Sequence, residues 1–89
     1  MKFRLKVSKQ AERFLDRHSE AFAYKFERAF MQICENPFRA TGLDIKKLKG
    51  LKQDFRLRIG QYRMLYTTVN DIVYVYRIDT RGDVYKGKR

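Results

Sequence analysis

Apolar and polar residues alternate in two adjacent stretches near the middle of the chain, residues 55–59 and 62–66. A period of two residues is typical of β-strands with one buried face. Gly60-Gln61 separates the two stretches, and glycine at the first central position favours a two-residue type II′ turn. The pattern therefore predicts a β-hairpin in which Ile59 faces Tyr62 and Arg58 faces Arg63.

The predicted register gives this hairpin one apolar face and one basic face. The apolar face is expected to belong to the core (Phe55, Leu57, Ile59, Tyr62, Met64 and Tyr66). The other face carries Arg56, Arg58 and Arg63, with Leu65 opposite Arg56. Like charges directly opposite each other destabilise a strand pair. The arginines therefore indicate either an anion that binds among them or a solvated strand face, and the hairpin alone leaves both interpretations open.

The first part of the chain predicts one strand and two helices. Residues 1–7 alternate, and a helix at about residues 9–17 and a longer one at about 20–35 follow. Ser8 and Ser19 are suitable N-cap residues for these helices. The second helix has an apolar stripe at helical spacing, which we interpret as core (Phe22, Phe26, Ala29, Phe30 and Ile33).

The rest of the chain predicts a connector and a meander of strands. Asn36-Pro37 ends the second helix, and residues 38–53 form a connector that apolar residues could pin to the body. The second hairpin strand runs to about residue 69, Asn70-Asp71 forms the next turn, and residues 72–79 form a central strand. Simple pairing would put Arg77 on the core face beside Met64, so we expect a β-bulge or a shifted register there.

The element order β-α-α-β-β-β indicates an α+β fold. We expect residues 1–89 to form a single domain in which two N-terminal helices pack on one face of a curved, mainly antiparallel sheet. The first strand is expected to pair with the meander.

Net charge is the most informative aspect of the composition. The chain has 21 Lys and Arg residues against 10 Asp and Glu residues, a net charge of +11, and most of the excess lies after residue 44. A concentrated basic field favours a polyanionic partner: nucleic acid first, an acidic protein segment second. The connector beside the arginine hairpin is either a solubilising loop or a binder of nucleic-acid backbone (Lys46, Lys47, Lys49 and Lys52).

Several classes of chemistry have no support in the sequence. Cys34 is the one cysteine, and within a helix it is expected to be a small buried hydrophobe that suits the reducing cytoplasm. His18 has no neighbours at metal-ligand spacing, so we expect neither a metal nor another cofactor. No apolar run is long enough to span a membrane, and the N-terminus lacks a signal-peptide segment.

Three motifs together resemble the RelE toxins of the RelE/ParE superfamily: KKLKG at residues 46–50, FRLRIGQYRMLY at 55–66 and RGDVY at 81–85. The resemblance covers essentially the whole chain, including the order of the helices. It implies a toxin that an antitoxin holds inactive and that cleaves mRNA in the ribosomal A site. The implied reaction needs no metal: a 2′-hydroxyl attacks the adjacent phosphate and leaves a cyclic phosphate and a 5′-hydroxyl.

The same resemblance assigns roles to individual residues. Arg63, Arg81 and Tyr85 match family positions, and Arg56 and Arg58 stand where the best-known RelE pattern has lysine. These five residues form the expected catalytic set. Lys86 joins the four connector lysines as an expected RNA-binding residue. Many relatives carry a histidine where this chain has Thr80, so proton transfer is expected to fall to Tyr85 or to a nucleic-acid or ribosomal group, unless Tyr85 only stacks on a base.

The expected partners follow from the same comparison. They are an acidic, partly disordered RelB-like antitoxin, the ribosome and mRNA, with the free toxin a monomer in the cytoplasm. Two other functions remain open at this point. One is a ParE-like toxin that binds DNA gyrase, and the other is a non-enzymatic RNA-binding module.

Overall fold

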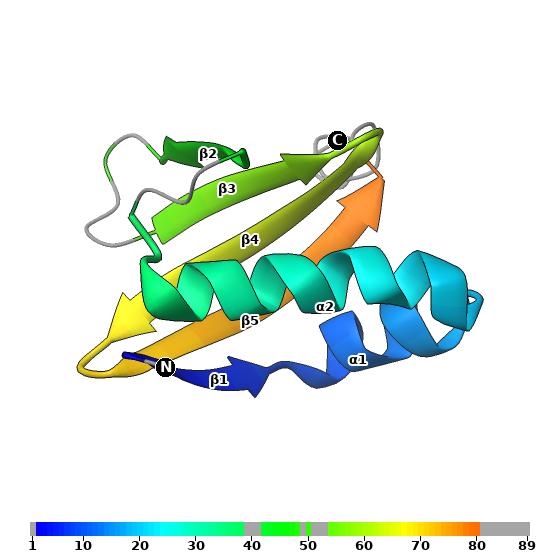
Figure 1. Cartoon of the computed structure of the whole chain (residues 1–89), viewed down its shortest axis with the longest axis horizontal. Helices are drawn as coiled ribbons and strands as arrows, with labels where there is room; N and C mark the ends of the chain where they lie inside the picture. The colour runs from blue at the N-terminus through cyan, green and yellow to red at the C-terminus, as the bar shows by residue number, and fades with distance from the viewer. Residues whose placement is uncertain (1, 39–41, 49, 51–53, 81–89) are drawn as a thin grey trace.

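The computed structural model describes residues 2–38, 42–48, 50 and 54–80 (Figure 1). Strand β1 (Arg4–Val7) leads into helices α1 (Lys9–Asp16) and α2 (Glu20–Glu35). Strands β2 (Asp44–Lys47), β3 (Asp54–Ile59), β4 (Tyr62–Val69) and β5 (Ile72–Thr80) follow. Both helices lie on one face of the sheet, so the expected α+β layering is confirmed.

The described strands form one five-stranded sheet in the order β1-β5-β4-β3-β2. Strand β1 pairs with β5, which confirms the expected pairing with the meander. This pair is parallel, and all other pairs among the described strands are antiparallel. Strand β2 lies within residues 38–53, which the sequence pattern predicts to be a connector, so this strand is an addition to the predicted elements. It pairs with β3 through the backbone, and only Ile45 among its residues packs against the core.

The helices begin at the expected capping residues. The hydroxyl oxygen of Ser8 accepts a hydrogen bond from the Ala11 N–H at 3.1 Å, and that of Ser19 accepts one from the Phe22 N–H at 3.2 Å. Each bond satisfies one of the N–H groups that have no partner within the first helical turn. Helix α2 ends at Glu35, immediately before Asn36-Pro37.

The β3–β4 hairpin has the register that its sequence predicted. Ile59 pairs with Tyr62, Arg58 with Arg63 and Arg56 with Leu65. Gly60 has a φ of +59°, in the left-handed region that the first central residue of a type II′ turn requires. The alternation of core and polar residues therefore continues across both strands.

A register shift at Leu65/Tyr66 resolves the conflict between β4 and β5. Tyr66 pairs with Val75 and Leu65 with Arg77, so one residue of β5 is skipped. Met64 consequently lies opposite Ile78, which is fully buried, and Arg77 moves to the other face. The expected bulge is confirmed.

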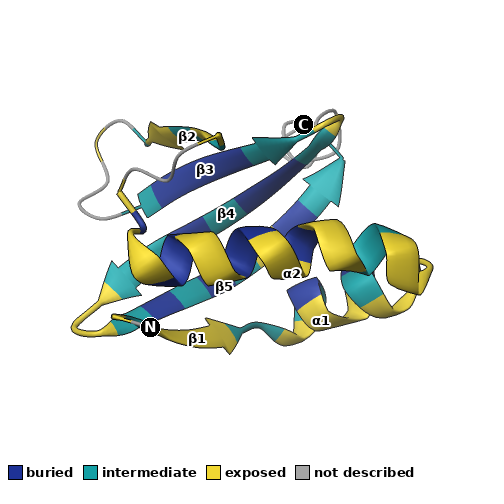
Figure 2. Cartoon of the chain, viewed as in Figure 1, coloured by how far each residue is buried: buried dark blue, intermediate teal, exposed yellow. Residues whose placement is uncertain are grey.

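The core lies between α2 and the apolar face of the sheet (Figure 2). Most of the predicted helix stripe is buried, and Phe26 is only 1% exposed. It meets fully buried sheet residues that include Leu57 and Met64. Phe22 and Tyr62 close the α1 end of this core, with their ring centroids 4.9 Å apart.

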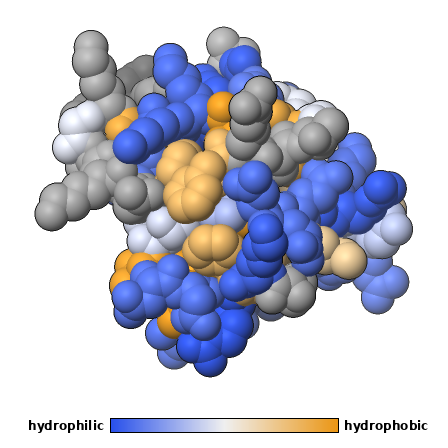
Figure 3. Space-filling model, turned by 60° about the vertical axis from the view of Figure 1, so that its left-hand side comes forward, coloured by the Kyte–Doolittle hydropathy of each residue, from blue (hydrophilic) through white to orange (hydrophobic). Residues whose placement is uncertain are grey.

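Figure 3 turns toward the viewer the left-hand side of Figure 1, where α2 ends and the β4–β5 turn lies. A few apolar side chains lie there among hydrophilic ones. Phe38, just after α2, is half exposed and packs edge-on against Phe3 and Phe55, with ring centroids 6.2 and 5.6 Å away. These two contacts tie the segment that leaves α2 to the residue before β1 and to β3.

Candidate functional site

Three arginines gather on the sheet face that is turned away from the helices. Arg56 and Arg58 come from β3 and Arg63 from β4, and they alternate with core residues. Arg58 and Arg63 are direct cross-strand partners. We call this face, with these three residues, the arginine face. The fold thus brings together the three hairpin residues of the expected catalytic set.

Two of the three arginines are buried. Arg56 is 9% exposed and Arg63 is 8% exposed, whereas the Arg58 side chain is 34% exposed. Burying a guanidinium group is costly unless an anion or hydrogen-bond acceptors compensate for the lost water. The arginine face therefore requires acceptors close by.

Asp44 of β2 supplies one such acceptor, and the sequence pattern did not single it out. Its Oδ2 accepts a hydrogen bond from Arg58 Nε at 2.8 Å and lies 2.8 Å from Arg58 Nη2. Its Oδ1 accepts a hydrogen bond from Arg56 Nη2 at 3.0 Å. The hydrogen bond from Arg58, and then the charges of the neighbouring arginines, hold the pKa of the Asp44 carboxyl below its usual value.

Asp79 of β5 lies on the other side of the arginines. It is the cross-strand partner of Arg63, as Asp44 is of Arg58, so the four residues form one row across β2, β3, β4 and β5. Asp79 Oδ2 also lies 2.6 Å from Arg77 Nη2. The repulsion expected between Arg58 and Arg63 is thus offset by a carboxylate at each end of their row.

The arginine face keeps an unused hydrogen-bond donor. Arg56 Nε is buried and makes no hydrogen bond to any residue that the structure describes. An unsatisfied buried donor costs about 1–3 kcal/mol. Another acceptor, such as a phosphate oxygen, would remove this cost.

The lysines of the connector divide between the two faces of the sheet. Lys46 pairs with Arg56, so it shares the arginine face, and it is exposed. Lys47 is also exposed but pairs with Phe55, which places it on the side of the helices. The other expected site residues lie outside the described residues (Lys49, Lys52, Arg81, Tyr85 and Lys86).

Two described tyrosines are poorly suited to proton transfer. The Tyr66 hydroxyl is buried and donates a hydrogen bond to the Pro37 carbonyl oxygen at 2.6 Å. Burial raises the pKa of Tyr66, and it also raises that of Tyr76, where the Asp54 charge adds to the effect. Ionisation of either side chain is therefore disfavoured.

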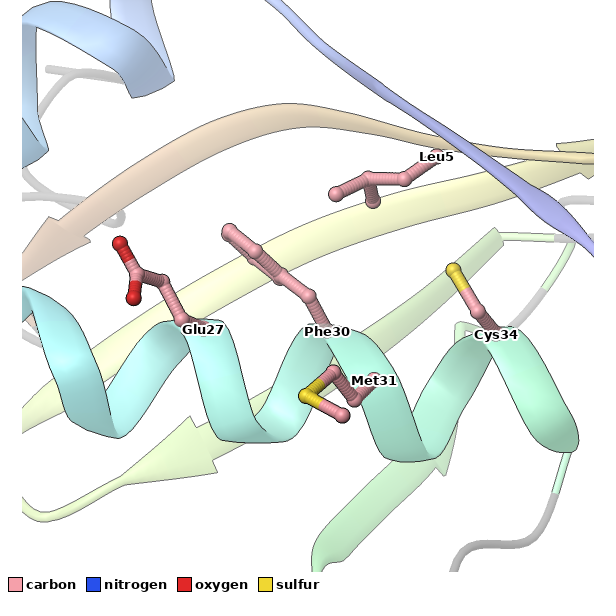
Figure 4. Close-up of a pocket in the computed structure, with 5 residues that line it drawn as sticks. All are labelled: Leu5, Glu27, Phe30, Met31 and Cys34. Carbon is pink, nitrogen blue, oxygen red and sulfur yellow. The ribbon is translucent and has the colours of Figure 1, made fainter. Parts of the chain in front are cut away.

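Cys34 and His18 both have structural surroundings. Cys34 lines a small apolar pocket of about 200 Å³ between β1 and α2, with Leu5, Glu27, Phe30 and Met31 (Figure 4). The thiol is buried, which raises its pKa and keeps it protonated, as expected for a packing residue. The His18 ring stacks on Phe22 with centroids 4.1 Å apart, and its Nδ1 lies 2.6 Å from the Phe14 carbonyl oxygen.

In the described ranges, no group of three or more His, Cys, Asp or Glu side chains could hold a metal ion. Neither described helix is long and apolar enough to cross a membrane.

Comparison with known proteins adds the evolutionary context. A family model described as the ParE toxin of type II toxin–antitoxin system, parDE, matches residues 5–85. The curated toxin RelE1 of Methanocaldococcus jannaschii is 31% identical over 88 residues, which are 97% of this chain and 98% of the relative.

Solved structures agree with this relationship. A chain of the archaeal RelE–RelB complex from Pyrococcus horikoshii superposes with a TM-score of 0.77 at 28% identity, over 92% of this chain and 98% of that one. A chain of the intact Escherichia coli RelBE toxin–antitoxin complex superposes with a TM-score of 0.72 at 16% identity, over 88% and 95%. The second similarity concerns the fold alone.

Proposed function

This chain belongs to the RelE/ParE superfamily as a RelE-type toxin of a RelBE-type toxin–antitoxin system, and we propose that it cleaves mRNA in the ribosomal A site. The observation that carries the proposal is the convergence of Arg56, Arg58 and Arg63 on one sheet face. The translating ribosome as target would place the free toxin in the cytoplasm, where we expect it to be a monomer.

The proposed reaction is an in-line phosphodiester cleavage. The 2′-hydroxyl of one nucleotide loses its proton and attacks the adjacent phosphorus, and the bond from phosphorus to the 5′ oxygen of the next nucleotide breaks. The products are a 2′,3′-cyclic phosphate and a 5′-hydroxyl that has gained a proton. The phosphorus centre carries extra negative charge in the transition state, and fixed cations that already surround it stabilise that charge.

The arginines are suited to the electrostatic part of this reaction. Arg63 and Arg56 are held by burial, so little reorganisation is needed when charge develops on the phosphate. Arg58 is more exposed and can meet the incoming RNA first. The guanidinium group is planar and binds phosphate through two parallel hydrogen bonds. Lys46, on the same face, would contact the flanking backbone.

Proton transfer is proposed for the C-terminal motif. Arg stays charged at all relevant pH values, so it is a poor base. Tyr85 could act as the base if several cations lower its pKa from the usual value of about 10, and Arg81 would add to those cations. Tyr85→Phe keeps the ring and removes only the hydroxyl. Cleavage should then collapse while affinity for the ribosome holds, whereas activity near that of the unsubstituted chain would show a stacking role.

The remaining expected lysines would bind the RNA backbone outside the reacting phosphate. They are proposed as a set (Lys47, Lys49, Lys52 and Lys86). Phosphate contacts of this kind position the chain without reading sequence, and they make affinity fall with salt. Lys47, on the helix side of the sheet, is expected to contribute less than Lys46 on the arginine face.

A ParE-like function is the second candidate, because the matching family model describes ParE toxins. Such a toxin acts by binding DNA gyrase and needs no catalytic arginine set. In vitro translation of a defined mRNA, followed by mapping of cut sites, tests the proposal. Cuts confined to A-site codons of translating ribosomes support it. Gyrase-dependent DNA damage without mRNA cleavage would support the ParE-like function, and neither effect would leave a non-enzymatic RNA-binding module.

An acidic antitoxin is the proposed regulator. Two of the related structures are complexes of RelE with RelB, and this chain has a net charge of +11. A partly disordered acidic segment could wrap the domain and fold as it binds. It would screen the arginine face from RNA.

A further inference from the structure

The Asp44 carboxylate occupies guanidinium donors of two residues on the arginine face. Its two oxygens contact Arg56 and Arg58 at 2.8–3.0 Å, and the three guanidinium nitrogens involved come from two side chains on one strand. A guanidinium group binds carboxylate and phosphate through the same planar arrangement of donors. The position of the carboxylate therefore marks a position that suits a phosphate.

We propose that Asp44 is an internal competitor for the RNA phosphate, which must displace its carboxylate from Arg56 and Arg58 in order to bind there. This inference rests on the proposed function for the identity of the ligand, a phosphate of an RNA backbone. It assigns Asp44 as a positioning residue that keeps the arginines paired while the site is empty. It also implies that the free toxin binds phosphate more weakly than its charge suggests.

The location of Asp44 lowers the free-energy cost of displacing its carboxylate from the arginines. It belongs to a four-residue strand at the edge of the sheet, which pairs only with β3 in the part of the chain that the structure describes. Its side chain is 45% exposed, so the carboxylate can rotate into water and be solvated. Arg56 is buried and would stay in place, and its Nε donor, which makes no hydrogen bond to a described residue, could bind the phosphate as well.

Asp79, the other carboxylate in the row, is not suited to the same role. Its side chain is only 16% exposed, and it forms a 2.6 Å contact with Arg77 on its own strand. To move away from Arg63, the Asp79 carboxylate would have to give up its contact with Arg77. It would also have to reach water from β5, a strand inside the sheet. Asp79 is therefore a fixed neighbour of Arg63, whereas Asp44 is the exchangeable anion.

Binding of inorganic phosphate to the free chain tests the proposal without a ribosome. Asp44→Asn removes the competing charge, and Asp71→Asn is the matched control. Asp71 pairs with Arg4 at 3.4 Å, and it lies at the β4–β5 turn, at the opposite end of β4 from Arg63. Both variants change the net charge by the same amount. Affinities are measured from the rise in unfolding temperature with phosphate concentration, and then with a short single-stranded RNA by fluorescence anisotropy.

Asp44→Asn should bind phosphate about tenfold more tightly. In the unsubstituted chain the phosphate must break charge-assisted hydrogen bonds between Asp44 and the arginines, and one such bond corresponds to about tenfold in affinity. Asp71→Asn should change affinity by about twofold or less, because a distant exposed charge is screened. Asp44→Glu retains a carboxylate and should stay close to the unsubstituted chain.

Three results would overturn the proposal. Equal phosphate affinities for Asp44→Asn and Asp71→Asn would mean that net charge alone, and not competition by Asp44, sets the affinity. Weaker binding by Asp44→Asn would mean that Asp44 only holds the arginines in position for the ligand. Tightening by Asp44→Glu as large as that by Asp44→Asn would mean that the carboxylate is not the competitor. Because no readout depends on cleavage, failure of the ribonuclease proposal would be seen separately, in the translation assay.

Discussion

Asp44 and Arg58 face each other across β2 and β3, and one carboxylate oxygen of Asp44 lies 2.8 Å from both Nε and Nη2 of Arg58. This contact makes β2 part of the arginine face, although β2 contributes little to the core. The cationic site therefore extends over strands that are separated in sequence. Part of its charge balance comes from Asp44, which lies 12 positions before Arg56 and 14 before Arg58.

The packing of α2 on the sheet predicts a large loss of stability on truncation of Phe26. Phe26→Ala removes a fully buried ring and should lower the free energy of unfolding by about 3–5 kcal/mol. Met31→Ala is the control, because Met31 is on the same helix but 64% exposed. Its cost should be about 0.5 kcal/mol or less. Urea unfolding measures both, and similar losses for the two variants would contradict the layered core.

The pairing of Asp44 predicts a pH dependence of stability. Its pKa is lower in the folded chain than in the unfolded chain, so ionised Asp44 stabilises the fold. The stability difference between the unsubstituted chain and Asp44→Asn should be fully present above about pH 4, the usual carboxyl pKa. It should shrink as the pH falls through the folded pKa. Urea unfolding at several pH values tests this, and a difference that stays constant down to pH 2 would argue against the pairing.

The buried Tyr66 hydroxyl is predicted to act in stability and not in catalysis. Tyr66→Phe leaves the Pro37 carbonyl oxygen without its donor, which should cost about 1–3 kcal/mol. Tyr24→Phe serves as the control, since Tyr24 is 57% exposed on α2. Thermal unfolding compares the two variants. A neutral Tyr66→Phe would show that the hydrogen bond contributes nothing net.

An electrostatic antitoxin interface predicts a salt dependence. The complex of this chain with its acidic antitoxin should weaken steadily as salt rises from about 0.05 to 0.5 M, because screening shortens the range of the attraction. Calorimetry at several salt concentrations measures the trend. An affinity that does not change over this range would indicate an interface dominated by apolar contacts.

The hairpin and its arginines could be predicted from sequence because their signals are local. The period of two, together with Gly60, fixes which residues of β3 and β4 face each other. The bulge was also predictable, since without it Arg77 would have entered the core beside Met64. In each case a register shifted by one residue would have turned a charged side chain into the apolar core between the sheet and the helices.

Strand β2 and the role of Asp44 could not be predicted in the same way. Residues 44–47, DIKK, contain one apolar side chain and follow Gly42, so they have no repeating pattern. The strand exists because its backbone pairs with the edge of β3, which is a non-local interaction. Asp44 becomes a partner of Arg56 and Arg58 only through that pairing. The C-terminal part of the expected site, Arg81 and Tyr85, lies outside the described residues.

The rate of A-site cleavage by Arg63→Ala tests whether the arginine face is the catalytic site. The comparison is Arg28→Ala, which removes the same charge from an exposed position on α2. Single-turnover cleavage on ribosomes that carry a defined A-site codon should be slower by roughly 100-fold or more for Arg63→Ala, as for the loss of one transition-state donor. Arg28→Ala should cleave at close to the unsubstituted rate, and both variants should still bind ribosomes. Equal cleavage rates for Arg63→Ala and Arg28→Ala would contradict the assignment of the arginine face as the catalytic site.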